Sequence, residues 1–229
     1  MKGDPLGPRL GPEAHINRGP VVTPRQAATV IVLRGASEGL EVLLVKRTPE
    51  ARFMGGVWVF PGGSVDDTEG DGDRSHRAAA VRELREETGI ELANPEILVK
   101  FSRWITPAEV TIRFDTHFYL APMPDGQEPI VDGAEIVDHR WFTPADALTA
   151  NDGGEIVLVF PTIKHLEQLR PFASADELLA YARGRTVEAV QPRVVMRRDP
   201  EQEGEVARIV LPGEPGYETE AREDPGGRH

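Results

Sequence analysis

The chain contains no cysteine among its 229 residues, so disulfide bonds, zinc–thiolate sites and thiol catalysis are all excluded. It also has no apolar run approaching the ~20 residues that a membrane-spanning helix needs. Its first residues, MKGDPLGPRLGPEAH, lack an apolar core like that of a secretory signal peptide. We therefore expect a cytoplasmic protein that makes no use of a membrane.

Positive charge is in short supply, and the formal net charge is −12. This balance disfavours a general nucleic-acid-binding surface, because such a surface needs a basic footprint to replace the counterions of the phosphates. If the substrate is itself an anion, the protein must supply local positive charge, most simply through a metal ion. The apolar and charged fractions, 39% and 28%, are those of a globular protein, and we expect one principal domain.

Composition changes along the chain predict four segments. Proline and glycine without a periodic apolar pattern indicate a flexible N-terminal arm over residues 1–24, and a polar tail over 214–229 is expected to be disordered. Between them we expect the main domain over 25–150. A C-terminal extension of two helices and a hairpin, residues 151–213, is expected to pack on that domain.

The main domain is expected to mix strands with few helices. A hairpin is predicted from two β-branched runs, Ala27 to Arg34 and Leu40 to Arg47, and a helix from Ser75 to Thr88 is expected to stop at Gly89. Ser174 and Glu177 fit a capping box. The remaining expected strands are 58–63, 97–105, 111–121, 135–142, 189–197 and 206–213, and the remaining helices begin at 144, 161 and 174.

The stretch AVRELREETGI, residues 80–90, places Glu83, Glu86 and Glu87 within two turns of the expected helix. Positions i, i+3 and i+4 share a face, so three like charges lie together beside Arg82, which costs stability unless a cation joins them. A solvated face, ion pairs with neighbouring arginines and a basic partner surface are the alternatives. In the sequence, the helix that carries the three glutamates follows a glycine pair and an acidic loop.

That arrangement closely resembles the Nudix box, G-x5-E-x7-R-E-U-x-E-E-x-G-U, in which U is aliphatic. Its second half is filled without exception by Arg82, Glu83, Leu84, Glu86, Glu87, Gly89 and Ile90. The first half departs, because the expected Glu position holds Arg74 and the expected Gly position holds Thr68. Gly63 is then the loop glycine, with about five inserted residues, and Glu69, Asp71 and Asp73 are the candidates for the missing Glu.

The resemblance implies an α+β fold, an α/β/α sandwich in which helices flank a mixed β-sheet, here with a small C-terminal helix and hairpin extension. It implies a hydrolase that acts on acid anhydrides in phosphorus-containing compounds and requires Mg²⁺ or Mn²⁺, hard cations that suit oxygen ligands. The implied metal ligands are the Gly63 carbonyl, Glu83, Glu86 and Glu87. Arg82 is implied to hold the glutamates in position by ion pairing.

The residue that removes a proton from the attacking water is a separate question. Some family members draw an acidic residue from a loop near the following strand, and Glu135 is the best candidate here, with Asp132 and Asp138 behind it. The choice between Glu135 and Glu83 as the base stays open at the level of sequence. A fully conventional edge-strand carboxylate is an equal alternative for Glu135.

A finer likeness concerns the substrate. The phrases RFMGGVWVFPGG, WITP and RFDTHFYLA resemble the Nudix subgroup that includes peroxisomal acyl-CoA diphosphatases. This implies a small-molecule substrate in which a nucleoside diphosphate is linked to another moiety, with CoA or acyl-CoA as candidates. ADP-ribose, dinucleotide or sugar-nucleotide cleavage and a non-catalytic nucleotide sensor are the alternatives.

Candidate substrate-binding residues are cations for phosphate and an aromatic ring for a base: Arg47, Arg52, Arg113 and Trp104. For each of them a surface or core role is the competing interpretation. We expect His76 to be solvated and His117 to be packed. Residues 161–213 are candidates for a cover over the substrate cleft or for a homodimer interface.

Overall fold

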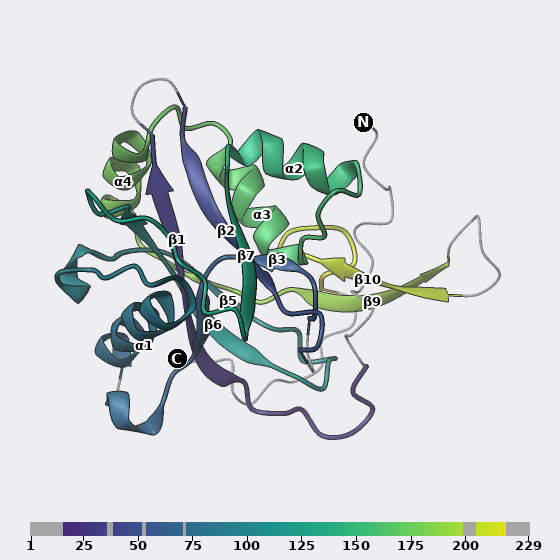
Figure 1. Cartoon of the computed structure of the whole chain (residues 1–229). Helices are drawn as coiled ribbons and strands as arrows, with labels where there is room; N and C mark the ends of the chain where they lie inside the picture. Colours follow the sequence, from purple (N-terminus) through teal and green to yellow (C-terminus); the bar gives the residue numbers. More distant parts are fainter. Residues whose placement is uncertain (1–15, 36–38, 52–53, 71, 199–204, 219–229) are drawn as a thin grey trace. The chain divides into compact units, whose positions relative to one another are not determined.

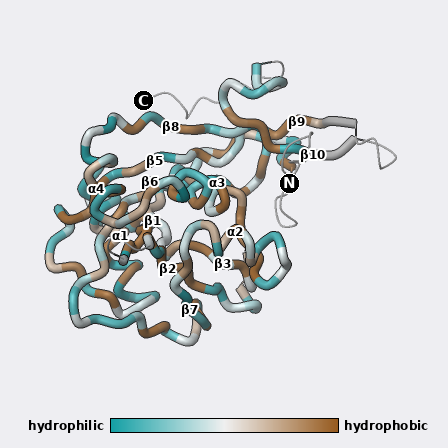
Figure 2. The backbone as a smooth tube through the Cα atoms, turned by 90° about the horizontal axis from the view of Figure 1, so that it is seen from above, coloured by the Kyte–Doolittle hydropathy of each residue, from teal (hydrophilic) through white to brown (hydrophobic). Residues whose placement is uncertain are grey.

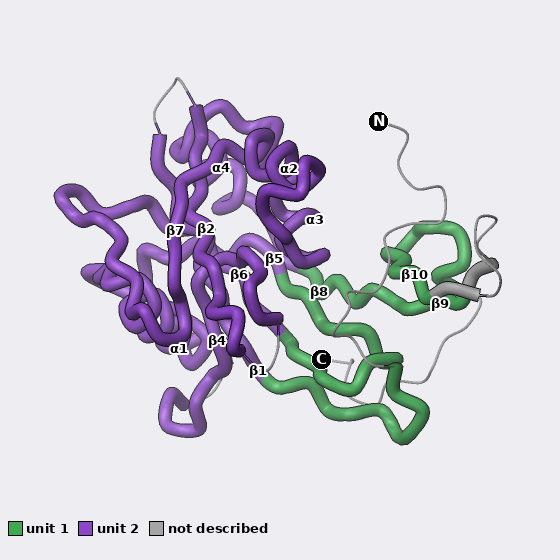
Figure 3. The backbone as a smooth tube through the Cα atoms, turned by 45° about the vertical axis from the view of Figure 1, so that its right-hand side comes forward, with its two compact units in different colours: residues 1–25, 103–115, 188–229 green, residues 26–102, 116–187 purple. Residues whose placement is uncertain are grey.

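The computed structural model describes residues 16–35, 39–51, 54–70, 72–198 and 205–218. Two compact units divide the chain, and Figure 3 shows them in different colours. Unit 1 contains residues 1–25, 103–115 and 188–229, and unit 2 contains residues 26–102 and 116–187. The units do not coincide with the predicted segments 25–150 and 151–213. Residues 151–187 belong to the same unit as most of the predicted main domain, whereas residues 103–115 belong to the other unit.

The sheet is built around a central hairpin (Figure 1). Strands β1 (Arg25–Arg34) and β2 (Glu41–Arg47) pair antiparallel, with Leu33 opposite Val42, as the sequence predicts. The strand order is β3-β2-β1-β6-β5-β8, with β4 paired to β1 and β7 paired to β2. The other strands of this set are β3 (Trp58–Val59), β4 (Gly62–Ser64), β5 (Val99–Ile105), β6 (Phe114–Pro122), β7 (Ile136–Phe142) and β8 (Ala189–Val190).

Helices cover both faces of the sheet in unit 2. Neighbouring residues of a strand point to opposite faces. On β6, Tyr119 is in the same buried cluster as Leu84 of α1 (Gly72–Thr88), whereas the ring of Phe118 lies 4.1 Å from that of His165 on α3 (Phe160–Leu169). The predicted α/β/α arrangement of a mixed sheet between helices is thereby confirmed.

The remaining helices are short, and their ends follow from capping. Helix α2 (Pro144–Asp152) begins at Thr143, whose side chain accepts a hydrogen bond from the Asp146 N–H, and α4 (Ala175–Arg183) begins at Ser174. The predicted Ser174 cap is confirmed; Glu177 accepts from the Ala173 N–H, at 2.8 Å. Among the described helices, none combines the length and apolar character needed to cross a membrane.

The core of unit 2 forms where β1 and β2 meet α1. Alternate residues of β1, Ala28, Val30 and Val32, are fully buried in one cluster with the helix residues Ala80 and Leu84. The hydropathy of each position along these strands can be followed in Figure 2. Burial of this apolar face fixes which side of α1 faces the sheet, so the glutamates of the helix are left on its remaining surface.

Unit 1 combines three separate stretches of the chain. The end of β5 pairs parallel with β8, Arg103 opposite Ala189, and β9 (Arg193–Arg198) forms an antiparallel hairpin with β10 (Glu205–Val210). Part of the predicted N-terminal arm is described and belongs to this unit. There the Asn17 N–H donates to the carbonyl of Glu109 at 2.6 Å, whereas residues 1–15 of that arm and 219–229 of the predicted tail lie outside the described ranges.

Candidate active site

The second half of α1 carries the three glutamates beyond the buried core. Leu84 is fully buried against the sheet, whereas Glu83 is partly buried and Glu86, two residues after Leu84, is exposed. Glu87 lies one turn after Glu83 and is only 4% exposed. Gly89 ends the helix in a left-handed conformation, φ 66°, where a side chain would be strained.

A glycine pair comes directly against these carboxylates. Gly62 and Gly63 lie on β4 opposite Thr29 and Ala28 of β1. The Gly62 N–H donates to Oε2 of Glu87 at 2.9 Å. A Cβ on Gly63 would collide with the Glu83 carboxylate. Glycine is therefore needed because the backbone of β4 and the glutamates of α1 approach closely.

Arg82 lies at the centre of an ion-pair network. Its Nε donates to Oε1 of Glu69 at 2.9 Å, and its Nη1 reaches Oε1 of Glu83 at 2.7 Å and Oε2 of Glu86 at 3.2 Å. Its Nη2 donates to the Ser64 carbonyl at 2.9 Å. The hydrogen bond to Glu69, opposed by burial and aided by Glu83, raises the pKa of Arg82 above its usual value. Arg82 thus joins α1 to the loop that precedes it.

Among the described candidates for the missing box Glu, Glu69 is the one that contacts Arg82. Its side chain is 10% exposed, pairs with Arg82 and also accepts a hydrogen bond from the Asp66 N–H at 2.7 Å. Asp66 and Glu69 together form a capping box around the 3₁₀ turn η1 (Asp67–Glu69). The D-x-x-E spacing was the signal in the sequence. Asp71, another candidate, lies outside the described residues.

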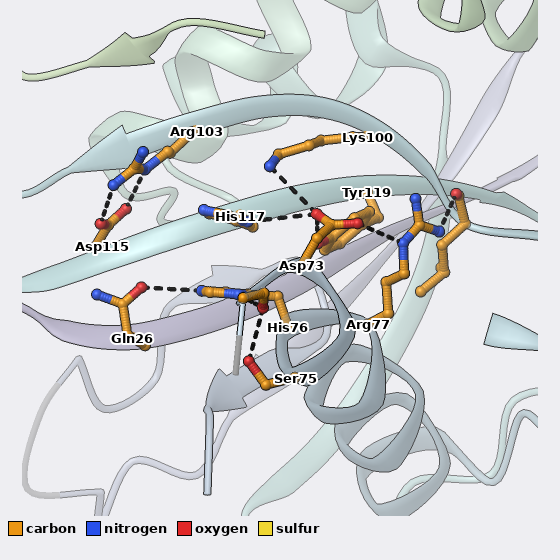
Figure 4. Close-up of polar contacts among 12 residues, drawn as sticks. Gln26, Asp73, Ser75, His76, Arg77, Lys100, Arg103, Asp115, His117 and Tyr119 are labelled. Atoms are coloured by element: carbon orange, nitrogen blue, oxygen red, sulfur yellow. Dashed lines mark hydrogen bonds and ion pairs between the residues drawn. The ribbon is translucent and has the colours of Figure 1, made fainter. Parts of the chain in front are cut away.

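The third candidate, Asp73, belongs to a different cluster at the start of α1 (Figure 4). Its carboxylate accepts from Arg77 at 2.7 Å, from the Tyr119 hydroxyl at 2.9 Å and from Lys100 at 3.3 Å. Burial raises the pKa of Asp73, but these partners outweigh it and bring the pKa down to about 2. Asp73 therefore ties α1 to β5 and β6.

Two histidines pack beside that cluster. The rings of His76 and His117 are stacked, with centroids 3.8 Å apart, and both side chains are buried. Nδ1 of His76 faces the Gly72 carbonyl at 2.8 Å and its Nε2 faces Oε1 of Gln26 at 3.0 Å (Figure 4). The expectation of a solvated His76 is therefore wrong, because the helix start lies against β6. The expectation that His117 is packed is confirmed.

Burial and mutual repulsion set the electrostatics of the glutamates. Burial raises the pKa of Glu87 to about 8, against the hydrogen bond from Gly62 and with the help of the charges on Glu83 and Glu135. Burial likewise raises the pKa of Glu83, opposed by Arg82. The negative charge of Glu135 contributes to the raised pKa of both residues, because it disfavours a further negative charge nearby. A cation at this place would relieve the repulsion.

The three acidic candidates near β7 have different surroundings. Glu135 is joined electrostatically to Glu83 and Glu87, as described above. Asp138 accepts from the His139 N–H at 2.8 Å, and its other oxygen lies 3.8 Å from Nε of Arg140. The Asp132 carboxylate is engaged by backbone N–H groups of its own loop. Of the three, Glu135 is the one whose charge affects the pKa values of Glu83 and Glu87.

Of the predicted substrate-binding residues, Arg47 lies beside the carboxylates. Its Nη2 is 3.0 Å from Oε1 of Glu135, and its charge lowers the pKa of Glu87 against the effect of burial. Arg52 lies outside the described residues. Arg47 thus supplies positive charge at the edge of the acidic cluster, where a phosphate could accept hydrogen bonds from it.

The other two predicted substrate contacts are buried in unit 1. Trp104 is 5% exposed and Arg113 is 1% exposed. The guanidinium of Arg113 donates to the carbonyls of Thr106, at 3.1 Å, and Val22, at 2.6 Å. These contacts give Arg113 a packing role, so neither residue is kept as a substrate contact. Sequence did not reveal which face of each strand is covered.

The donor set suits a hard divalent cation. Glu83, Glu86 and Glu87 supply carboxylate oxygens next to the Gly63 backbone, and such oxygens are the ligands that Mg²⁺ and Mn²⁺ prefer. Burial is the main cause of the raised pKa values of Glu83 and Glu87, and neighbouring carboxylates raise both further. Within the part of the chain that the structure describes, no three His, Asp or Glu side chains enclose an ion-sized site, and Arg82 occupies Glu83 and Glu86.

Comparison with known proteins finds a matching family model and several relatives. A family model described as NUDIX domain matches residues 23–160. The Caenorhabditis elegans protein named putative nudix hydrolase 7 is 30% identical over 181 residues, which cover 63% of this chain and 60% of that protein. The chain thus spans less than two thirds of this relative. A human protein named acyl-coenzyme A diphosphatase NUDT19 is 23% identical over 73% of this chain and 74% of its own length.

The fold also has a counterpart among solved structures. A crystal structure titled NUDIX hydrolase, from Alicyclobacillus acidocaldarius, superposes with a TM-score of 0.62 and 28% sequence identity. The match covers 69% of this chain and 96% of that one. The part of the fold shared with that protein is therefore nearly its whole structure.

Proposed function

This chain belongs to the Nudix hydrolase family, and from that membership we propose that it hydrolyses the phosphoanhydride bond of a nucleoside diphosphate linked to another moiety. Water attacks one phosphorus, the bond from that phosphorus to the bridging oxygen breaks, and two phosphate-bearing products leave. The observation that carries this proposal is the close approach of Glu83 and Glu87 to the Gly62–Gly63 backbone, where the Gly62 N–H donates to Glu87 at 2.9 Å.

The proposed metal ligands are Glu83, Glu86, Glu87 and the Gly63 carbonyl, with Mg²⁺ or Mn²⁺ as the ion. When bound, the ion would supply the positive charge that offsets the phosphates and makes the water more acidic. Burial raises the pKa of Glu87 to about 8, so binding a cation would be accompanied by proton release from this group near neutral pH. Arg82, through Glu69 and Ser64, holds the helix against the loop.

Other residues have roles toward the substrate and the water. Glu135 would accept the proton of the attacking water, since it is exposed enough to be reached and lies near Glu83 and Glu87. Arg47 would exchange its ion pair with Glu135 for hydrogen bonds to a phosphate. Both steps use groups already next to one another, which keeps the reacting atoms in one small volume.

The proposed substrate class is CoA or acyl-CoA. The support is the sequence likeness to the human protein named acyl-coenzyme A diphosphatase, which extends over 73% of this chain, together with the phrases RFMGGVWVFPGG, WITP and RFDTHFYLA. ADP-ribose, dinucleotides and sugar nucleotides share the same diphosphate chemistry. Homodimer formation, a cytoplasmic location and the absence of nucleic-acid binding stay predictions.

A substrate panel tests this proposal. Purified protein is incubated with CoA, an acyl-CoA, ADP-ribose, NADH, a sugar nucleotide and an oxidised nucleotide, with Mg²⁺, with Mn²⁺ and with chelator. We expect metal-dependent cleavage, fastest for the CoA compounds. Preference for another panel member would keep the hydrolase and discard the CoA assignment, and no cleavage with metal bound would instead support a nucleotide sensor.

Matched variants separate the site from the general charge of the helix. Glu86→Gln should lower turnover by orders of magnitude with the fold intact, because it removes a proposed ligand. Glu91→Gln removes an exposed carboxylate just beyond the end of α1 and should leave turnover unchanged. Near-wild-type turnover of the Glu86→Gln protein would remove Glu86 from the metal site.

A further inference from the structure

The loop that carries Glu135 is anchored at both of its ends. At its start, the Ile130 N–H donates to the Thr88 carbonyl at the end of α1, at 2.8 Å. At its end, the Glu135 carbonyl accepts from the Thr48 N–H just after β2, also at 2.8 Å. The segment therefore bridges the helix that carries the glutamates and the strand that carries Arg47, and both are parts of unit 2.

Asp132 orders the backbone between those anchors. One carboxylate oxygen accepts from the N–H groups of Ala134, at 3.2 Å, and Glu135, at 2.8 Å, and the other accepts from Ile136 at 2.8 Å. Gly133 takes a left-handed conformation, φ 75°, and its N–H donates to the Ile136 carbonyl at 2.9 Å. A single side chain thus satisfies three consecutive donors that a loop would otherwise leave to water.

The same bonds stabilise the ionised form of Asp132. Burial raises the pKa of Asp132 and is the largest single effect, but the backbone hydrogen bonds from Glu135, Ile136 and Ala134 together outweigh it and lower the pKa. Asp132 is therefore a carboxylate at neutral pH and accepts all three bonds at once. An asparagine could accept with its one amide oxygen, whereas an alanine could accept none.

These contacts fix the position of the Glu135 Cα, from which its side chain extends. Its own N–H is held by Asp132 and its carbonyl by Thr48, so both peptide groups that flank its Cα are fixed. Its carboxylate reaches Arg47 at 3.0 Å and raises the pKa of Glu83 and Glu87. The orientation of a long, 57% exposed side chain is thus set by main-chain bonds and by one ion pair.

We propose that Asp132 is a positioning residue that presets Glu135 for removal of a proton from the attacking water. The inference rests on the proposed function, in which Glu135 is the base. Asp132 touches neither substrate nor water in this scheme. It acts by removing the freedom of the loop, so that the carboxylate of Glu135 need not be ordered at the moment of reaction.

A double-mutant cycle with the substrate that the wild type cleaves best tests this role. Glu135→Gln should lower kcat by about 10²–10⁴-fold, the usual contribution of a general base. Asp132→Ala should lower kcat by about 10–100-fold with KM nearly unchanged, as loss of a supporting contact does. Asp132→Asn should recover part of that loss, because its one amide oxygen can replace only one of the two accepting oxygens. In the Glu135→Gln background, Asp132→Ala should cost nothing further, because the group through which it acts is gone.

Two results would overturn the proposal: an equal Asp132→Ala loss with and without Glu135, which would mean a general structural role, or a kcat unaffected by Asp132→Ala. Asp125→Ala, which removes an exposed aspartate from another turn, is the control and should change neither kcat nor KM.

Hydrogen exchange separates this inference from the proposed function. Asp132→Ala should speed exchange at the amides of Ala134, Glu135 and Ile136 while leaving the amides of α1 protected. If the wild type cleaves no panel member, the proposed function fails, and the assay of the wild-type protein alone shows this. Unchanged exchange at the three amides would instead defeat the ordering role of Asp132, whatever the wild type cleaves.

Discussion

At the scale of single residues, the buried side chain of Glu87 lowers the stability of the folded protein. Glu87 is 4% exposed and receives one backbone hydrogen bond, from Gly62. Burial raises the pKa of Glu87 to about 8, so at neutral pH the uncharged, protonated form of this side chain is favoured in the folded protein. A hydrophobic residue would pack there at lower cost, which is the pattern of a residue kept for chemistry.

His165 is the opposite case, a buried titratable group with a structural role. Its Nδ1–H donates to the Pro161 carbonyl at 2.6 Å, so the neutral ring accepts at Nε2 from the Ser102 hydroxyl, also at 2.6 Å. The rings of Phe118 and Phe101 lie nearby. Burial lowers the pKa of His165 from 6.5 to about 4, against the hydrogen bond to Pro161.

This shift predicts a specific acid sensitivity. The unfolded chain protonates His165 near pH 6.5 and the folded protein near pH 4, so stability is complete above pH 6.5 and is lost progressively as the pH falls toward 4. The loss is on the order of 3 kcal/mol. Denaturant unfolding with chelator present, at pH 7 and pH 4.5, measures it.

A variant assigns the acid sensitivity to the ring. His165→Gln should have a lower free energy of unfolding at pH 7 but a smaller fall between pH 7 and pH 4.5 than the wild type. His139→Gln, which changes a half-buried histidine on β7, should keep the wild-type fall. An equal fall in the His165→Gln protein would assign the acid sensitivity to other groups.

At the scale of elements, the two adjacent glycines of β4 face different neighbours, so one affects stability and the other affects the position of Glu83. A Cβ on Gly62 would meet the backbone of Ala28 and Thr29, which cannot move without disrupting the β1–β4 pairing. A Cβ on Gly63 would meet the end of the Glu83 side chain, which can move. The two positions should therefore respond differently to the same substitution.

We predict that Gly62→Ala lowers the free energy of unfolding by roughly 1–3 kcal/mol, the range for overpacking. Gly63→Ala should unfold at nearly the wild-type temperature but turn over at least tenfold more slowly, because Glu83 is displaced. Thermal unfolding and the rate on the best panel substrate measure the two effects. A Gly63→Ala protein with full turnover would show that Glu83 works equally well from another position.

The predictable elements were those whose signals are local. The hairpin of β1 and β2, the helix that ends at Gly89 and the Ser174 cap depend on periodicity and end residues within a few positions, and the structure confirms them. The Nudix assignment from residues 82–90 is likewise confirmed by the family match. Regular patterns and a compact motif therefore gave the right elements.

What sequence missed depends on contacts between distant segments. The box Glu could be assigned to Glu69 only through its contact with Arg82, thirteen residues away, because an insertion had shifted the register. Arg113 is buried where its guanidinium donates a hydrogen bond to the carbonyl of Val22, which lies 91 residues earlier in the sequence. The position of each element in the two units is also non-local, since unit 1 draws on three separate stretches.

At the scale of the whole molecule, the acidic site adds to an already acidic protein. With a net charge of −12, repulsion among carboxylates opposes folding throughout, and it is concentrated at Glu83, Glu86, Glu87 and Glu135. Salt screens such repulsion in general, whereas a divalent ion held by these side chains would relieve it at one place. The two effects can be told apart at equal ionic strength.

We predict that the chelator-treated protein is stabilised much more by about 10 mM MgCl₂ than by about 30 mM NaCl, which give the same ionic strength. An ion that binds only the folded state stabilises by about 2.7 kcal/mol at a hundred times its Kd, whereas screening acts on all the surface charges weakly. The unfolding temperature in each salt measures the difference. Glu87→Gln should unfold at a higher temperature than the wild type without metal, since glutamine removes the cost of burying an acidic group whose pKa is raised to about 8, and should respond equally to both salts. Glu91→Gln should keep the wild-type response. Equal shifts of the wild type in the two salts would mean that the carboxylates of α1 form no divalent-cation site, however closely they lie together.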